Sequence, residues 1–88
     1  MADIGLKDVP VLLAALVLHL CEREGVVTGE GYKIPTRYTH QQLEEIIGAK
    51  RVAATRALGK LRRIGAVEFK QRHVYVKDVK ALRQVAGK

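Results

Sequence analysis

The chain has 88 residues, which suffices for one compact domain and leaves no room for two. Its composition is 48% hydrophobic and 28% charged, which is typical of a globular protein and excludes an intrinsically disordered chain. The single cysteine, Cys21, excludes an internal disulfide, and no Cys or His pair has the spacing of zinc ligands. We therefore expect a single domain over residues 1–88 that uses neither a metal nor a cofactor.

The longest apolar segment, from Val9 to Cys21, is shorter than the roughly 20 residues needed to span a bilayer. It also lacks the basic leading segment and the small-residue cleavage site of a signal peptide. We expect a soluble, cytoplasmic protein without a membrane partner.

The net charge of +7 is distributed unevenly along the chain. Residues 1–48 contain four Lys or Arg and seven Asp or Glu, whereas residues 49–88 contain twelve and two. The second half therefore offers a basic surface that attracts polyanions such as nucleic acids. The alternative is a basic surface that is only solvated, and charge alone does not separate the two.

The first part of the chain predicts a helix over residues 8–24, which Asp8 can cap. Its apolar residues recur at helical spacing: Leu12, Leu13, Leu16, Val17 and Leu20. Because alanines and valines occupy its other faces, this helix needs cover on more than one side. Residues 25–38 are glycine-rich and then loosely alternating, and Pro35 limits them to a short edge strand or hairpin.

Residues 39–64 predict two short helices across a tight glycine turn. Thr39 and Gln42 have the spacing of a capping box, in which each side chain accepts a hydrogen bond from a first-turn amide. An apolar stripe follows and ends at Gly48; it consists of Leu43, Ile46 and Ile47. The second helix runs from about Lys50 to Arg63. Its apolar residues are Ala54, Ala57, Leu58, Leu61 and Ile64. This pattern indicates a helix-turn-helix, with an ordinary helical hairpin as the alternative.

After Gly65 the spacing of the apolar residues changes from the helical period to every second residue. Two half-buried strands are predicted within residues 66–77, with inward residues Val67, Phe69, Val74 and Val76. The joining residues Gln71 and Arg72 are neither Gly nor Asn, so we expect a turn wider than two residues. Asp78 can cap a last helix over residues 78–87, with Val79, Leu82 and Ala86 facing inward. The predicted fold is α+β, a winged helix-turn-helix with a β-hairpin as the wing.

The second helix of such a motif enters the major groove of DNA with its first turns against base edges. The outward positions predicted to read bases are Arg51, Val52, Thr55 and Arg56. The arginine fork matches O6 and N7 of guanine, whereas a valine can contact only a thymine methyl. Positions predicted to bind phosphate lie at helix starts, along the second helix and at the wing: Thr39, Gln41, Lys50, Lys60, Lys70 and Arg72.

We expect no enzymatic activity. Glu44 and Glu45 are adjacent and predicted to face solvent, and His19 lies within an apolar helix as a core residue. His40 and His73 have no nucleophile or carboxylate partner nearby in the sequence. The chain also lacks a glycine loop of the kind that cradles phosphate.

Three segments resemble the DNA-binding half of the Crp-Fnr family of bacterial transcription factors: 38–43 (YTHQQL), 47–51 (IGAKR) and 55–58 (TRAL). The similarity covers nearly the whole chain. It implies a homodimer with one recognition helix in each half-site of an inverted repeat, and RNA polymerase as a further partner. Arg51 and Arg56 match the two recognition-helix arginines of the family, and Thr39, Gln41, Lys50 and Lys70 match positions that usually meet phosphate.

The chain departs from the family in three respects. Val52 stands where a glutamate is frequent, and Ala53 replaces a common hydroxyl residue, so the usual target sequence is not carried over. The effector-binding β-roll and the long dimerisation helix are absent from these 88 residues. We therefore expect a domain excised from a longer regulator rather than a stand-alone relative.

Sequence-specific binding of double-stranded DNA for transcription regulation is the leading hypothesis. One alternative is a winged-helix protein-interaction module, in which Leu13, Leu16 and Val17 dock a partner. The other is a module that binds RNA or DNA without sequence preference.

Overall fold

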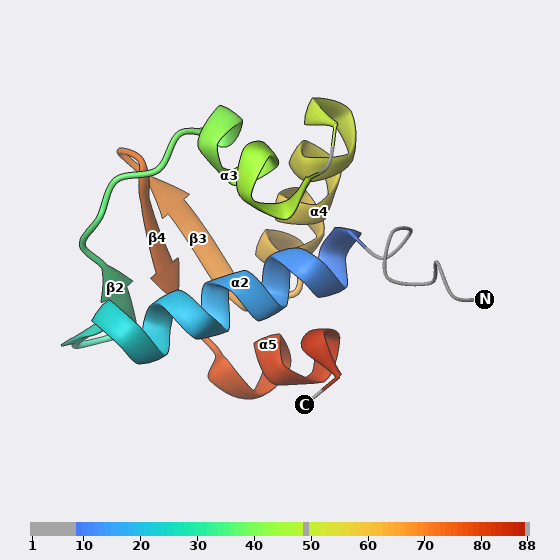
Figure 1. Cartoon of the computed structure of the whole chain (residues 1–88). Helices are drawn as coiled ribbons and strands as arrows, with labels where there is room; N and C mark the ends of the chain where they lie inside the picture. Colours follow the sequence, from blue (N-terminus) through green and yellow to red (C-terminus); the bar gives the residue numbers. More distant parts are fainter. Residues whose placement is uncertain (1–8, 49, 88) are drawn as a thin grey trace.

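The computed structural model describes residues 9–48 and 50–87, which form helices packed against one face of a small antiparallel sheet (Figure 1). In chain order the elements are α2 (Val9–Glu24), β1 (Val26–Thr28), β2 (Gly31–Ile34), α3 (His40–Ile47), α4 (Arg51–Arg63), β3 (Val67–Lys70), β4 (His73–Val76) and α5 (Val79–Ala86). This is the predicted α+β winged helix-turn-helix. The predicted cap at Asp8 lies outside the described residues. None of the described helices is long and apolar enough to cross a membrane.

Helix α2 is the centre of the domain and packs against α3, α4, α5 and two strands of the sheet (Figure 1). The prediction that this helix is covered on more than one side is thus confirmed. Its buried residues are Leu13, Ala14, Val17 and Leu18. Of the predicted apolar residues, Leu12, Leu16 and Leu20 are only half-buried, and Leu20 packs against the core. Ala14 is fully buried, and its small side chain lets neighbouring helices approach α2 closely. The buried side of α2 is therefore the side that carries Ala14.

His19 is exposed, so the prediction of a core histidine was wrong. The residues four before and three after it, Ala15 and Glu22, lie on the same face of the helix. That face is opposite to the buried one, and together with Arg83 of α5 it lines a shallow surface hollow.

The sheet has the strand order β1-β2-β4-β3, and every neighbouring pair is antiparallel. The prediction of an edge position was wrong for β2, which lies between β1 and β4. Pro35 follows the last residue of β2, so its missing amide does not interrupt the ladder. Gly31 has φ 143°, and a Cβ there would lie 2.1 Å from the carbonyl oxygen of Val76. Only glycine therefore fits where β2 begins to pair with β4.

Strands β3 and β4 form the wing, and their register pairs Lys70 with His73. The turn therefore consists of two residues only, and the prediction of a wider turn was wrong. Gln71 and Arg72 both adopt left-handed conformations, with φ 51° and 67°, which is the geometry that a two-residue hairpin requires. This conformation costs roughly 1–2 kcal/mol per non-glycine residue. The amide of Tyr38 donates to the carbonyl of Arg72 at 2.8 Å, which helps to hold the turn.

The core lies between α2, α4, α5 and the inner face of the sheet, and it is aliphatic as its composition requires. The largest fully buried side chains are Leu13, Ile34, Leu61, Leu82, Val17, Val74 and Val76. The inward alternation predicted for the wing is confirmed by the burial of Val67, Val74 and Val76. Leu82 and Ala86 of α5 are also buried, as predicted, and Asp78 caps this helix by accepting from the amide of Ala81 at 3.1 Å.

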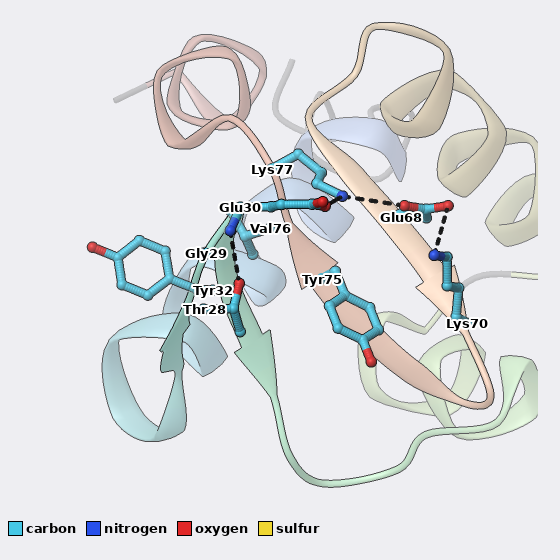
Figure 2. Close-up of a pocket in the computed structure, with 9 residues that line it drawn as sticks. All are labelled: Thr28, Gly29, Glu30, Tyr32, Glu68, Lys70, Tyr75, Val76 and Lys77. Atoms are coloured by element: carbon cyan, nitrogen blue, oxygen red, sulfur yellow. Dashed lines mark hydrogen bonds and ion pairs between the residues drawn. The ribbon is translucent and has the colours of Figure 1, made fainter.

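Lys77 connects the β1–β2 hairpin to the wing across a hollow on the outer face of the sheet (Figure 2). Its ammonium binds the carboxylate of Glu30 and lies 3.5 Å from the carboxylate of Glu68. Glu68 also lies 3.7 Å from Lys70. The hydrogen bond and charge of Lys77 lower the pKa of Glu30, and Glu30 in turn raises the pKa of Lys77.

These shifts predict how the ion pair contributes to stability as the pH changes. A lowered carboxyl pKa gives stability that is present above the unfolded value of 4.5 and is lost as pH falls through the folded pKa. A raised lysine pKa gives stability that is present below 10.5 and is lost as pH rises through the folded pKa. We expect Glu30→Gln to lower the melting temperature slightly at neutral pH and to have no effect in strong acid. Thermal unfolding across the acid range checks this, and an equal effect at all pH values would contradict it.

Candidate nucleic-acid interface

Helix α3 begins with the capping box that the sequence predicted. The hydroxyl of Thr39 accepts from the amide of Gln42 at 3.0 Å, and the Gln42 side chain accepts from the amide of Thr39 at 2.8 Å. Gly48, with φ 69°, ends the helix. Leu43 is buried, but Ile46 is 52% exposed, so the predicted stripe was wrong there. The short helix packs on α2 and α4 through one narrow side, and Ile46 points away from it.

Because the capping box satisfies two amides that would otherwise lack partners, Thr39→Ala should destabilise the domain by about 1 kcal/mol. Urea unfolding of the variant measures this loss. Gln41→Ala is the matched control, since Gln41 is exposed in the same turn and takes no part in the box. Equal losses for the two variants would show that the box contributes nothing.

Helix α4 lies against α3 and α2 through its small and apolar residues. Its buried positions are Ala54, Ala57, Leu58 and Leu61, as predicted. Ile64 is 44% exposed and does not belong to this set. It is the residue at which the helix ends, just before Gly65 turns the chain toward the wing with φ 78°. Lys50 precedes the helix in an extended conformation, and its side chain forms no capping hydrogen bond.

The opposite side of α4 carries all four residues predicted to read bases, which we call the reading face: Arg51, Val52, Thr55 and Arg56. All four are exposed, and Val52 is 64% exposed although it is apolar. Within the described residues, neither guanidinium of this face forms an ion pair or a hydrogen bond with the rest of the domain. The reading face is therefore free to contact another molecule.

The residues predicted to bind phosphate are also exposed, and they lie in different parts of the domain. Thr39 and Gln41 are at the start of α3, and Lys50 precedes α4. Lys60 lies two turns further along α4, while Lys70 and Arg72 flank the tip of the wing. Lys70 is partly engaged by Glu68, but its side chain remains 62% exposed. Their roles stay predictions.

One basic residue near this surface was missed by sequence reasoning. Arg37, in the loop before α3, donates from Nε to Nε2 of His73 in the wing at 3.5 Å. Nothing in the local sequence signals this contact, because the two residues are 36 positions apart.

The solvent-facing position predicted for Glu44 was wrong. Glu44 is half-buried, and one of its carboxylate oxygens is buried without a hydrogen-bond partner among the described residues. Glu45 is exposed, as predicted. Adjacent residues on a helix point in different directions, so the two glutamates differ in burial although they are neighbours in sequence. Among the described residues, no group of three or more His, Cys, Asp or Glu side chains could hold a metal ion.

Two helices across a tight turn, with a basic reading face on the second and an adjacent wing, define a winged helix-turn-helix domain. Residues 13–85 match the family model of the Crp-like helix-turn-helix domain, and the chain belongs to this family. The domain is therefore of the DNA-binding kind that transcription regulators carry, as the resemblance to the Crp-Fnr family predicted.

Similar proteins include the global nitrogen regulator of Synechocystis sp., which is 33% identical over 78 residues that cover 89% of this chain and 35% of that protein. The CRP-like cAMP-activated global transcriptional regulator of Mycobacterium tuberculosis is 26% identical over 93% of this chain and 37% of that protein. The chain thus spans about a third of the length of these relatives.

Solved structures share the fold. Oxidized CprK in complex with o-chlorophenolacetic acid superposes with a TM-score of 0.87 at 22% identity, over 99% of this chain and 37% of that one. The CO-dependent transcription factor CooA from Carboxydothermus hydrogenoformans gives a TM-score of 0.84 at 20% identity, over 96% and 39%.

Proposed function

We propose that this chain binds double-stranded DNA sequence-specifically, with α4 in the major groove, and thereby regulates transcription. One observation carries the proposal: all four residues of the reading face are exposed, while the opposite side of α4 is anchored in the core. An arginine fork presented in this way matches the O6 and N7 atoms of guanine. Arg51 and Arg56 are then the residues that select guanine, and Val52 contacts a thymine methyl.

Phosphate contacts fix the register of the helix in the groove. We assign them to Thr39, Gln41 and Lys50 at the helix starts, to Lys60, and to Lys70 and Arg72 of the wing. The amides of the first turn of α4 support Lys50 in this role, because the helix has no side-chain cap and its positive dipole end attracts anions.

The proposal extends to the partners of the domain. It acts as one half of a homodimer on an inverted repeat, with RNA polymerase as a further partner. The family membership supports this arrangement, since the named relatives are global regulators about two and a half times as long as this chain. The expected cytoplasmic location is part of the same proposal.

Selection of binding sites from random duplex DNA, followed by titration of the selected site at several salt concentrations, tests the proposal. We expect an enriched motif and an affinity that falls steeply with salt, by about one unit of slope for each neutralised phosphate. Binding that shows no preferred sequence would favour non-specific nucleic-acid binding instead. A flat salt response would refute the phosphate contacts.

The protein-interaction alternative loses most of the surface that was assigned to it. Leu13 and Val17 are each only 1% exposed because they pack in the core of the domain itself. Leu16 alone remains partly accessible. A partner therefore cannot dock on these three residues while the domain is folded.

A further inference from the structure

The loop that precedes α3 and the tip of the wing lie side by side (Figure 1). Two residues of the wing tie them together. The carbonyl of Arg72 accepts the amide of Tyr38 at 2.8 Å. His73 contacts the loop through both ring nitrogens, since Nδ1 lies 3.1 Å from the carbonyl oxygen of Ile34 and Nε2 lies 3.5 Å from Nε of Arg37.

These contacts assign the tautomer of the neutral imidazole of His73. The carbonyl of Ile34 can only accept, so Nδ1 carries the hydrogen and donates it. The guanidinium of Arg37 can only donate, so Nε2 offers its lone pair. The contact with Arg37 therefore requires the neutral ring, whereas the contact with Ile34 is the same in either state. A proton on Nε2 would replace the acceptor by a donor and place two cations 3.5 Å apart.

The described groups nearest to His73 are basic or aromatic, apart from Glu68. Lys70 is its direct partner in the β-ladder, and Arg72 precedes it in the turn. The ring of Tyr75 meets it edge-on at 6.4 Å, and the ammonium of Lys33 lies over that same ring. Glu68, opposite Tyr75 in the ladder, is already paired with Lys70 and Lys77.

We propose that His73 is a positioning residue of the DNA-binding surface and links binding to protonation. The neutral ring holds Arg37 against the wing. A proton from solvent that bonds to Nε2 breaks this hydrogen bond and releases the guanidinium to DNA phosphate beside the start of α3. The phosphates stabilise the added charge, so DNA binding takes up a proton. This inference rests on the proposed function.

Linkage is reciprocal, so the affinity for DNA increases as the pH falls through the range in which histidine changes charge, about pH 5 to 8. The test is the dissociation constant of the 88-residue chain for a random-sequence DNA duplex at about pH 8 and about pH 6. Such a probe suffices because phosphate contacts do not depend on sequence. We expect binding to be about fivefold or more tighter at the lower pH.

His73→Gln should abolish most of this difference, because its neutral amide oxygen can accept from Arg37 at either pH. His73→Lys, which is charged throughout, should bind tightly at both. Arg37→Gln should also reduce the difference and lower the salt slope near the acidic end by about one unit. Arg37 is exposed, so this variant carries the test if His73→Gln fails to fold.

His19→Gln is the control. His19 is exposed on α2, so this variant should keep the full difference between the two pH values. A full difference in His73→Gln overturns the role of His73 while leaving DNA binding intact. No duplex binding by the wild-type chain at either pH overturns both proposals.

Discussion

Leu61→Ala is expected to lower the free energy of unfolding by about 2–5 kcal/mol, through lost burial and the cavity that remains. Leu61 is fully buried in α4, where it holds the helix to the core. A small domain has a total stability of about 5–15 kcal/mol, so the variant loses a large share of it. Urea or guanidinium unfolding measures the effect through the shift of the transition midpoint.

Val52→Ala in the same helix is the matched control. Val52 is 64% exposed, so its truncation should change stability by no more than about 0.5 kcal/mol. Comparison of the two variants therefore distinguishes the contribution of the buried side of α4 to stability from that of its reading face. Similar losses in the two variants would mean that α4 is not anchored through Leu61.

Arg51→Ala should lose about 1–3 kcal/mol of discrimination at one base pair of the selected site, because a bidentate contact to guanine disappears. Competition between the selected site and its single-base variants measures this loss. The stability of the domain should change little, since Arg51 is exposed and no described residue bonds to its guanidinium.

Lys60→Ala provides the comparison for this prediction. A phosphate contact carries no sequence information, so its loss should weaken all duplexes equally and reduce the salt slope by about one unit. If Arg51→Ala behaved in the same way, Arg51 would contact phosphate rather than a base.

Local patterns in the sequence predicted the helix-turn-helix and the wing strands. The capping box needs only Thr39 and Gln42, which are three residues apart, and both of its hydrogen bonds are present. The inward alternation of the wing likewise depends on neighbouring residues. The exposure of the reading face follows from the same periodicity, because the positions between the buried residues of α4 must point outward.

Features that depend on distant segments could not be predicted in this way. Periodicity marked Ile46 and Ile64 as core residues, but a residue is buried only where another element covers it. The position of β2 inside the sheet depends on pairing with β4, which lies about 40 residues further along the chain. Composition disfavoured a two-residue turn at Gln71 and Arg72, whereas a hydrogen bond from the loop before α3 helps to hold it.

That hydrogen bond makes one backbone amide a reporter of the wing. The N–H of Tyr38 has its acceptor, the carbonyl of Arg72, on the tip of a hairpin 34 positions away. Exchange of this N–H with solvent deuterium therefore requires the loop and the wing to separate, while the helices can stay folded. A single exchange rate thus measures how often the wing opens. DNA that spans the wing and the start of α3 would slow this rate.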